Sequence, residues 1–361
     1  MKRIIVSVTN DISTDQRVAK VCNTLHNKGY DVLLIGRKLK NSNPLYRSYQ
    51  TKRIKLFFNK GFLFYAEYNF RLFLTLLFFK KNFLLSNDLD TLLPNFLISK
   101  LQNKKLIYDS HELFSEIPEL VNKPFTKKIW LGLERFLYPK LKNNYTVCDS
   151  IANYYKEKYN CLFSVIKNVP TQKKIEKGNL PFNSNGKKII IYQGAINIGR
   201  GLELMIETMN YLENFVFILI GCGDILENLQ KNVSTKKLND KVIFLGKMMP
   251  KDLQKITPLA TLGISLEEDL GLNYRFALPN KIFDYIQAEV PILVSDLPEM
   301  KQIVLNYNVG EIVLERKPEK IALQIKNMVE KEYKNQLEKA KKELIWEKEE
   351  PKLLSLLNNL T

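Results

Sequence analysis

The chain has 361 residues, enough for about two domains of ordinary size. Apolar residues make up 45% and charged residues 26% of the sequence, which excludes a disordered chain and a small disulfide-held scaffold. The formal net charge is +17, and residues 1–170, with 28 Lys and Arg against 13 Asp and Glu, carry +15 of it. Such a basic half attracts an anionic membrane, a phosphorylated acceptor or nucleic acid, unless it is simply a solvated lysine-rich surface.

The cysteines and histidines limit the chemistry further. Four cysteines lie scattered without CxxC spacing, which indicates a reducing compartment and no structural zinc site. There are only two histidines, so a multi-histidine metal centre is not expected. The apolar run 4–8 is too short for a signal peptide, and charges interrupt the longer run 57–85 too often for a membrane-spanning helix. We therefore expect a soluble or peripheral protein.

Strand and helix patterns alternate through the first half. Residues 4–8 form an apolar run typical of a buried parallel strand, and a helical pattern follows, ending near Gly29 before a strand at 31–35. Further strands are predicted at 105–108, 145–147 and 164–166, with a helix at 127–141. The polar stretch 171–188 interrupts this rhythm and is interpreted as a linker.

A second alternating block follows the linker. Strands are predicted at 188–192, 215–220, 242–245, 262–265 and 292–295, helices at 202–209 and 280–288, and a charged helical tail at 319–360. Two successive α/β units with parallel sheets fit this order, and ligands bind such sheets at the carboxyl ends of the strands. The space between two such domains is the expected site.

A glycine-rich turn joins the first strand of the second block to its first helix, with the sequence YQGAINIGRGL at 192–202. Gly194 allows close backbone approach, a helix N-terminus attracts an anion, and Arg200 can pair with a phosphate. The turn indicates a diphosphate cradle, or else an ordinary turn with a surface arginine. Gly221 and Gly223 follow the strand 215–220 and are open to the same two interpretations.

The densest group of polar residues follows the strand 262–265. It combines an acidic loop with the start of a helix: Glu267, Glu268, Asp269, Asn280, Lys281 and Asp284. Lys281 and Asp284 are three residues apart and share a helix face. A lysine near a helix N-terminus opposes the helix dipole unless it binds an anion, and a carboxylate beside it can hold ribose hydroxyls. The alternative is a local ion pair.

One histidine lies at a strand end of the first half. His111 follows the strand 105–108 within the sequence YDSHE, beside carboxylates and a serine, so we predict a functional role for it. His26 lies within the first helix pattern and is interpreted as structural.

These segments together resemble the retaining glycosyltransferases of family 4, the type that builds bacterial envelope polysaccharides, over nearly the whole chain. Residues 1–37 resemble the opening strand, loop and helix of that family, YDSHE its histidine motif, GAINIGRGL its phosphate-binding turn, and LPNKIFDYIQAEVPILVSD its donor-binding helix and strand. The region around Trp346 and Glu347 resembles the tail that crosses back to the first domain.

The resemblance implies the GT-B fold, with two Rossmann-like domains whose parallel sheets face a central cleft. The implied boundaries are an acceptor-binding domain at 1–170, a donor-binding domain at 171–340 and a returning helix at 341–361. The chain departs from the family at two places: Ala195 follows Gly194 where many members have arginine, and Phe276 stands where the first of two paired glutamates is usual. Glu267 or Glu268 would replace that glutamate from an earlier loop.

The implied reaction moves a sugar from a UDP- or GDP-linked donor to an acceptor hydroxyl with retention, without a metal or another cofactor. The resemblance assigns catalytic roles to His111, Glu267 and Glu268. It assigns donor binding to a larger set: Gly194, Arg200, Gly221, Gly223, Asp269, Asn280, Lys281 and Asp284.

Basic residues interleave with phenylalanines between 52 and 81, which is typical of a surface that binds an anionic membrane, although these rings could instead fill the core. We therefore expect a cytoplasmic enzyme, peripheral on the inner face of the membrane, with a glycan or lipid-linked acceptor. No nucleic-acid-binding motif is visible. A nucleotide-sugar epimerase of the same architecture and a non-catalytic scaffold remain as alternatives.

Overall fold

The computed structural model describes residues 1–117, 120, 123–358 and 360. The chain forms two compact units, one of Met1–Asn168 with Glu350–Thr361 and the other of Val169–Glu349. Residues 341–349, which we assigned to a returning tail, thus belong to the second unit. The reason is packing: Leu344 is buried in the core of that unit, and the Trp346 amide donates to the carbonyl oxygen of Pro170 at 2.8 Å.

The first unit is built on one parallel sheet with the strand order β3-β2-β1-β4-β5-β6-β7. Its strands are β1 (Arg3–Asp11), β2 (Asp31–Lys38), β3 (Gln50–Lys55), β4 (Phe83–Asn87), β5 (Lys105–Ser110), β6 (Asn144–Thr146) and β7 (Ser164–Val165). The order reverses between β1 and β4, which pair in parallel from Ile4 opposite Phe83 to Ser7 opposite Ser86.

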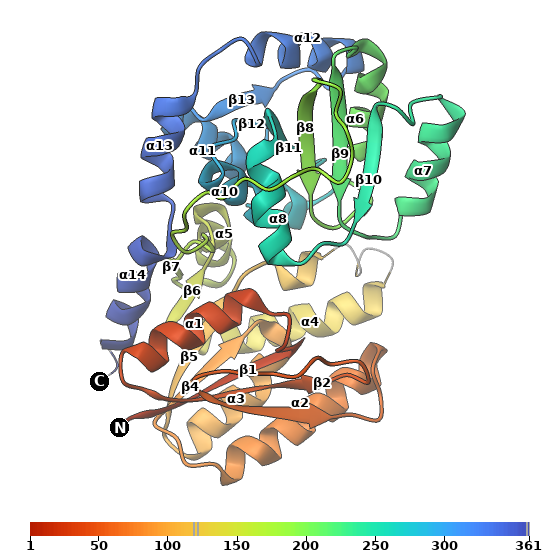
Figure 1. Ribbon diagram of the computed structural model, residues 1–361. Coiled ribbons are helices and arrows are strands. Elements are labelled where there is room, and N and C mark those ends of the chain that lie inside the picture. The colour runs from red at the N-terminus through yellow and green to blue at the C-terminus, as the bar shows by residue number, and fades with distance from the viewer. Residues whose placement is uncertain (118–119, 121–122, 359, 361) are drawn as a thin grey trace. The chain divides into compact units, whose positions relative to one another are not determined.

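In the described part of this unit, the α-helices between these strands are α1 (Gln16–Asn27), α2 (Gly61–Phe78), α3 (Leu89–Leu101), α4 (Pro124–Leu137) and α5 (Asp149–Tyr159). The Asp15 side chain caps α1 by accepting a hydrogen bond from the Val18 amide at 3.0 Å. Figure 1 shows α1 on one face of the sheet and α2 and α3 on the other. The inner face of α2, with Tyr68 and Leu72, closes the core over β1 and β2.

The second unit has its own parallel sheet, with the order β10-β9-β8-β11-β12-β13. The strands are β8 (Lys188–Gln193), β9 (Phe215–Ile220), β10 (Val242–Gly246), β11 (Leu262–Ser265), β12 (Ile292–Ser295) and β13 (Gly310–Val313). The reversal here lies between β8 and β11, where Leu262 pairs with Ile190.

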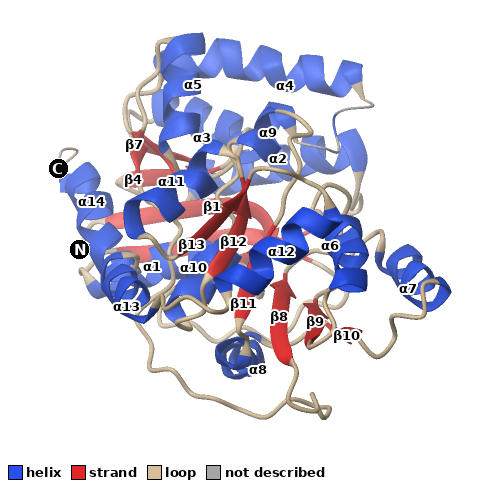
Figure 2. Ribbon diagram, turned by 90° about the horizontal axis from the view of Figure 1, so that it is seen from above, coloured by secondary structure: helices blue, strands red, loops and turns tan. Residues whose placement is uncertain are grey.

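Helices cover both faces of this sheet: α6 (Leu202–Thr208), α7 (Leu226–Thr235), α8 (Pro250–Ile256), α9 (Leu272–Arg275), α10 (Asn280–Gln287), α11 (Pro298–Tyr307), α12 (Pro318–Met328) and α13 (Lys334–Glu343). Helices α6, α7 and α12 close one core and α8, α10, α11 and α13 the other. Figure 2 shows α6 and α12 side by side. Helix α14 (Trp346–Asn358) begins in the second unit and ends in the first.

The fold class predicted from the sequence, two Rossmann-like units with parallel sheets, is confirmed. Three strands were missing from the prediction, β3, β4 and β13, and the charged tail forms three helices. The apolar run 57–85 divides into α2 and β4. Among the described residues, no helix has both the length and the hydropathy needed to cross a membrane.

Candidate functional site

Each unit carries a polar cluster where the strand order of its sheet reverses. Beyond the carboxyl ends of strands at such a reversal the neighbouring loops separate, and ligands bind there. In the second unit the loops after β8 and β11 meet at this point, and in the first unit the loops after β1 and β4 do so.

The glycines after β8 and β9 are required by contacts inside the protein. A Cβ on Gly221 would lie 1.8 Å from the carbonyl oxygen of Gly194, and one on Gly223 would lie 2.2 Å from Oδ1 of Asn197. A Cβ on Gly201 would lie 2.1 Å from the carbonyl oxygen of Leu266. The two turns therefore pack backbone against backbone, which accounts for Gly221 and Gly223 without a ligand.

Gly194 is different. It has a φ of +142°, and a Cβ there would meet only the Tyr192 ring, whose hydroxyl oxygen would lie 3.5 Å away. A side chain at Gly194 would thus meet fewer atoms of other loops than one at Gly201, Gly221 or Gly223.

Three charged side chains predicted for the site come together: Arg200 and Lys281, predicted for donor binding, and Glu267, predicted for catalysis. The Lys281 ammonium lies 2.7 Å from Oε1 of Glu267, and the Arg200 guanidinium lies 3.6 Å from the same oxygen. The Glu267 side chain is fully buried and Lys281 is 7% exposed, whereas Arg200 is 28% exposed. Arg200 is therefore the cation of this cluster that an anion reaches most directly.

Neighbouring polar and charged groups favour the charged form of Glu267 despite its burial. Burial raises the pKa of Glu267, but Lys281, the Ser265 hydroxyl and Arg200 outweigh burial, so its pKa lies below its usual range. Burial and Arg200 lower the pKa of Lys281, although Glu267 opposes them. The Lys281 ammonium also lies 4.1 Å from the Tyr192 ring centroid, a cation–π contact.

The remaining predicted donor residues surround this cluster at different depths. Asp284 accepts a hydrogen bond from the Gln193 side chain at 3.1 Å, so it faces the end of β8. Asn280 is exposed at the first turn of α10. Asp269 forms an exposed ion pair with Arg275, and the Glu268 carboxylate lies 3.9 Å from Arg316. Of the three consecutive acidic residues, Glu267 alone is brought to Lys281.

Arg316 was missed by sequence reasoning. Its guanidinium donates to the carbonyl oxygen of Leu266 at 2.9 Å and to the Ser295 hydroxyl at 2.8 Å, and it thereby fixes the start of the acidic loop. No motif signals this residue, because it lies 50 residues from the carbonyl that it contacts.

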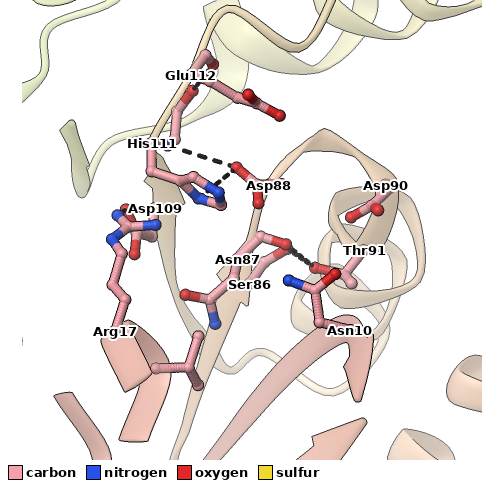
Figure 3. Close-up of polar contacts among 12 residues, drawn as sticks. Asn10, Arg17, Ser86, Asn87, Asp88, Asp90, Thr91, Asp109, His111 and Glu112 are labelled. Atoms are coloured by element: carbon pink, nitrogen blue, oxygen red, sulfur yellow. Dashed lines mark hydrogen bonds and ion pairs between the residues drawn. The ribbon is translucent and has the colours of Figure 1, made fainter. Parts of the chain in front are cut away.

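The cluster in the first unit is built around His111 (Figure 3). Its Nδ1 lies 2.8 Å from Oδ1 of Asp88, and its backbone amide donates to the same oxygen at 3.4 Å. Asp88 follows β4 with a φ of +58°. Burial disfavours the charged imidazole, but Asp88 outweighs it, with a smaller effect of Glu112, and raises the pKa of His111 to about 9.

Other charged groups are buried beside it. Arg17 of α1 pairs with Asp109 at the end of β5. Asp90 accepts a hydrogen bond from the Thr9 hydroxyl at 2.5 Å, and burial together with Asp88 raises the pKa of Asp90 to about 8. Of these residues, sequence reasoning placed only His111 in a site. The partners lie up to 92 residues apart in the chain, and only the sheet order brings them together.

The raised pKa of His111 predicts a pH-dependent stability. The protonated imidazole stabilises the fold fully below the unfolded pKa of about 6.5, and this contribution is lost as pH rises through about 9. The melting temperature of His111→Gln should therefore fall less between pH 7 and pH 9.5 than that of the wild type. Thermal denaturation followed by circular dichroism measures both slopes. His26→Gln is the matched control and should keep the wild-type slope; equal slopes in all three proteins would refute the ion pair.

Among the described residues, no group of three or more His, Cys, Asp or Glu side chains is arranged to hold a metal ion.

Comparison with known proteins gives a family match for the second unit. Residues 173–344 match the protein family described as "Glycosyl transferases group 1". No curated protein matches the chain in sequence.

Several solved structures share the whole fold. Sucrose-phosphate synthase from Thermosynechococcus elongatus is 14% identical, with a TM-score of 0.79, and the match covers 100% of this chain and 99% of that one. Anabaena HepE, solved with UDP-glucose, is 12% identical with a TM-score of 0.75, covering 99% of this chain and 100% of that one.

A putative UDP-N-acetylglucosamine 2-epimerase from Listeria monocytogenes is also similar, at 13% identity and a TM-score of 0.65, covering 99% of this chain and 96% of that one. At these identities the likeness shows the fold and does not separate transferase from epimerase. The family match spans both the glycine-rich turn and α10 and supports a transferase. The chain thus has the GT-B fold, its residues 173–344 match the glycosyl transferases group 1 family, and the comparisons support a glycosyltransferase enzyme.

Proposed function

We propose that the protein transfers a sugar from a nucleoside diphosphate sugar to a hydroxyl of a glycan acceptor that is lipid-linked or membrane-proximal. The observation that carries this proposal is the charge cluster of Arg200, Glu267 and Lys281 beneath the turn after β8. It lies where the strand order of the sheet reverses, within the matched domain. The UDP-glucose of the HepE complex supports a uridine nucleotide as the first donor to test.

The proposed chemistry breaks the bond between the sugar C1 and the diphosphate oxygen. The diphosphate leaves with the electron pair, and the acceptor hydroxyl oxygen bonds to C1 from the same face. The proton of this hydroxyl passes to the departing phosphate oxygen. Because the acceptor attacks the same face that the diphosphate leaves, the configuration at C1 is retained. The developing charge needs preorganised cations, and Arg200 is the accessible one, with Lys281 beneath it.

Other residues would position the donor. Asp284, held by Gln193, would accept hydrogen bonds from ribose hydroxyls, and the partly buried Glu268 with the exposed Asp269 and Asn280 would orient the sugar and nucleotide. In the first unit, His111 is protonated at neutral pH, so it would act as a hydrogen-bond donor or a cation rather than as a base.

Nucleotide binding without a metal is the direct test. A ligand at 100 times its dissociation constant adds about 2.7 kcal/mol of stability, so a thermal-shift screen with UDP, GDP, ADP, CMP and their sugar conjugates, in EDTA and then with magnesium, detects it. We expect one nucleoside diphosphate to raise the melting temperature equally in EDTA. Arg200→Gln should weaken that binding about 10- to 100-fold, because a hydrogen bond to a charged group contributes about 1.5–3 kcal/mol.

The control for Arg200→Gln removes a charge elsewhere in the same unit. Lys236 pairs with Glu207 at 2.9 Å on the surface, so Lys236→Gln should bind nucleotide as the wild type does. Equal weakening in both variants would show that net charge alone accounts for the effect. Incubation with UDP-sugars and product analysis then separates the outcomes: an epimerised nucleotide sugar would overturn the transferase, and bound nucleotide without turnover would indicate a scaffold.

A further inference from the structure

The outer face of α2 is apolar along its whole length. Every fourth residue from the first turn to the last is an exposed apolar residue: Phe62, Ala66, Phe70, Leu74 and Phe78. Phe62 is 68% exposed, Phe70 64% and Phe78 79%. Leu72 and the other buried positions lie on the opposite side of the helix, in the core. A helix on the surface of a soluble domain normally has a polar outer face, so this stripe requires a partner surface.

The segment around the stripe is strongly basic. Residues 52–81 contain seven Lys and Arg residues and one acidic residue, Glu67. The Glu67 carboxylate accepts hydrogen bonds from the backbone amides of Phe57 and Phe58 at 2.9–3.1 Å and pairs with Arg71 at 2.8 Å. The single negative charge is therefore neutralised within the protein, and the fold of this segment holds the exposed Phe57 ring against Arg71, 5.2 Å from its guanidinium.

Helices α3 and α4 also carry exposed apolar side chains. The Gln102 side chain donates to the Leu77 carbonyl oxygen at 2.9 Å and so ties the end of α3 to the end of α2, which lie side by side in Figure 1. Leu97 and Leu101 are exposed on α3, four residues apart. On α4, Phe136 is exposed beneath the Lys140 ammonium, 3.2 Å from its ring centroid. Exposed apolar side chains thus continue from α2 onto α3 and α4, and the exposed ring on α4 has a cation beside it.

The combination of exposed apolar side chains with an excess of basic residues indicates what kind of partner binds this surface. Phenylalanine rings and aliphatic side chains bury in the boundary between headgroups and acyl chains, and lysines beside them contact anionic headgroups. A second copy of the chain would instead bring the same excess of positive charge against this surface. We propose that the outer face of α2, continued by α3 and α4, docks the protein on an anionic lipid bilayer. The inference rests on the proposed membrane-proximal acceptor and names the surface that reaches it.

Flotation with lipid vesicles tests the proposal. The wild type should float with vesicles of equal parts phosphatidylcholine and phosphatidylglycerol at low salt, and much less with phosphatidylcholine alone or at high salt. Substituting Phe62, Phe70 and Phe78 together by serine should weaken binding about 10-fold or more, because three exposed rings lose their apolar contact with lipid. Substituting Lys55, Lys60 and Lys80 by glutamine should weaken binding and flatten its salt dependence.

The matched control places serine at three exposed apolar positions of the second unit, Leu305, Leu314 and Leu323, and should float as the wild type does. Circular dichroism melting verifies that each variant folds. The proposal is overturned if the phenylalanine variant floats as the wild type does, if the wild type binds no anionic vesicle, or if sedimentation shows a dimer that this variant abolishes. Nucleotide binding is measured on the same preparations, so a failure of the proposed donor chemistry with intact vesicle binding is distinguishable from a failure of the docking surface.

Discussion

Lys281→Met is expected to destabilise the second unit by about 3–5 kcal/mol, because it removes the cation closest to the fully buried carboxylate of Glu267. The Glu267 side chain is fully buried, and its nearest remaining cation, Arg200, lies 3.6 Å away. Methionine matches the volume of the lysine stem, so the loss reports charge rather than a cavity. Urea denaturation with a second-unit probe measures the change.

A double variant isolates the pair. Replacing Glu267 and Lys281 together by methionine removes both buried charges, and we expect its stability to return to within about 2 kcal/mol of the wild type. Arg275→Met is the control, because its pair with Asp269 is exposed; it should cost less than about 1 kcal/mol. A single Lys281 variant as stable as this control would mean that Glu267 is not held as a buried carboxylate.

The pH dependence of the stability of Lys281→Met provides a second test of the same variant. In the wild type the depressed pKa of Glu267 adds stability above the unfolded pKa of about 4.3, and this is lost as pH falls through the folded pKa. Without Lys281, burial dominates and raises the pKa of Glu267, so stability should instead fall as pH rises above about 4.3. The cost of Lys281→Met should therefore grow from pH 5 to pH 8.

The double variant also separates folding from function. It should fold, yet it lacks the cation that lies directly beneath the turn after β8, so its affinity for a nucleoside diphosphate should fall about 10-fold or more. Isothermal titration with UDP on the folded double variant measures this. Wild-type affinity would show that the buried pair serves stability alone.

Much of the fold could be predicted from apolar runs and turn signals. Runs such as 4–8 and 189–192 are almost entirely apolar because their strands lie between helices on both faces, and this pattern indicates buried parallel strands. Strand β4 (Phe83–Asn87) was missed since it follows α2 after only four residues, within the same largely apolar segment 57–85. Strand β3 was missed for the opposite reason: it is an edge strand, mostly exposed and rich in cations, so it carries no apolar run.

The site was predictable in residue type but not in arrangement. Sequence reasoning selected Glu267, Glu268 and Asp269 as a group, since three adjacent carboxylates look equivalent. The turn after β11 directs only Glu267 inward, because Arg316 and Ser295 bind the backbone at that point. The sequence left open whether Gly221 serves a ligand or a tight turn, and in the structure its close approach to the Gly194 carbonyl oxygen already requires a glycine. Such contacts depend on the distance between loops, which no local pattern contains.

Gly201→Ala is expected to destabilise the second unit by about 2–5 kcal/mol and to abolish most nucleotide binding. Gly201 has a φ of +69°, which costs an alanine about 1–2 kcal/mol. In addition, the new Cβ would lie 2.1 Å from the Leu266 carbonyl oxygen and 2.7 Å from the Leu266 Cβ, so the turn must move away, at a cost of about 1–3 kcal/mol. Since Arg200 immediately precedes this glycine, the movement displaces the accessible cation of the cluster.

Gly246→Ala separates the effect of the contact with Leu266 from the effect of the backbone conformation. Gly246 has nearly the same φ, +67°, but a Cβ there would meet no atom within 4 Å. It should therefore cost only the conformational strain of about 1–2 kcal/mol and should keep the melting-temperature rise that UDP produces. Equal destabilisation of the two variants, with nucleotide binding retained in both, would show that the turn at Gly201 relaxes freely. A larger loss in Gly201→Ala alone would show that close packing of this turn on the loop after β11 holds Arg200 in place.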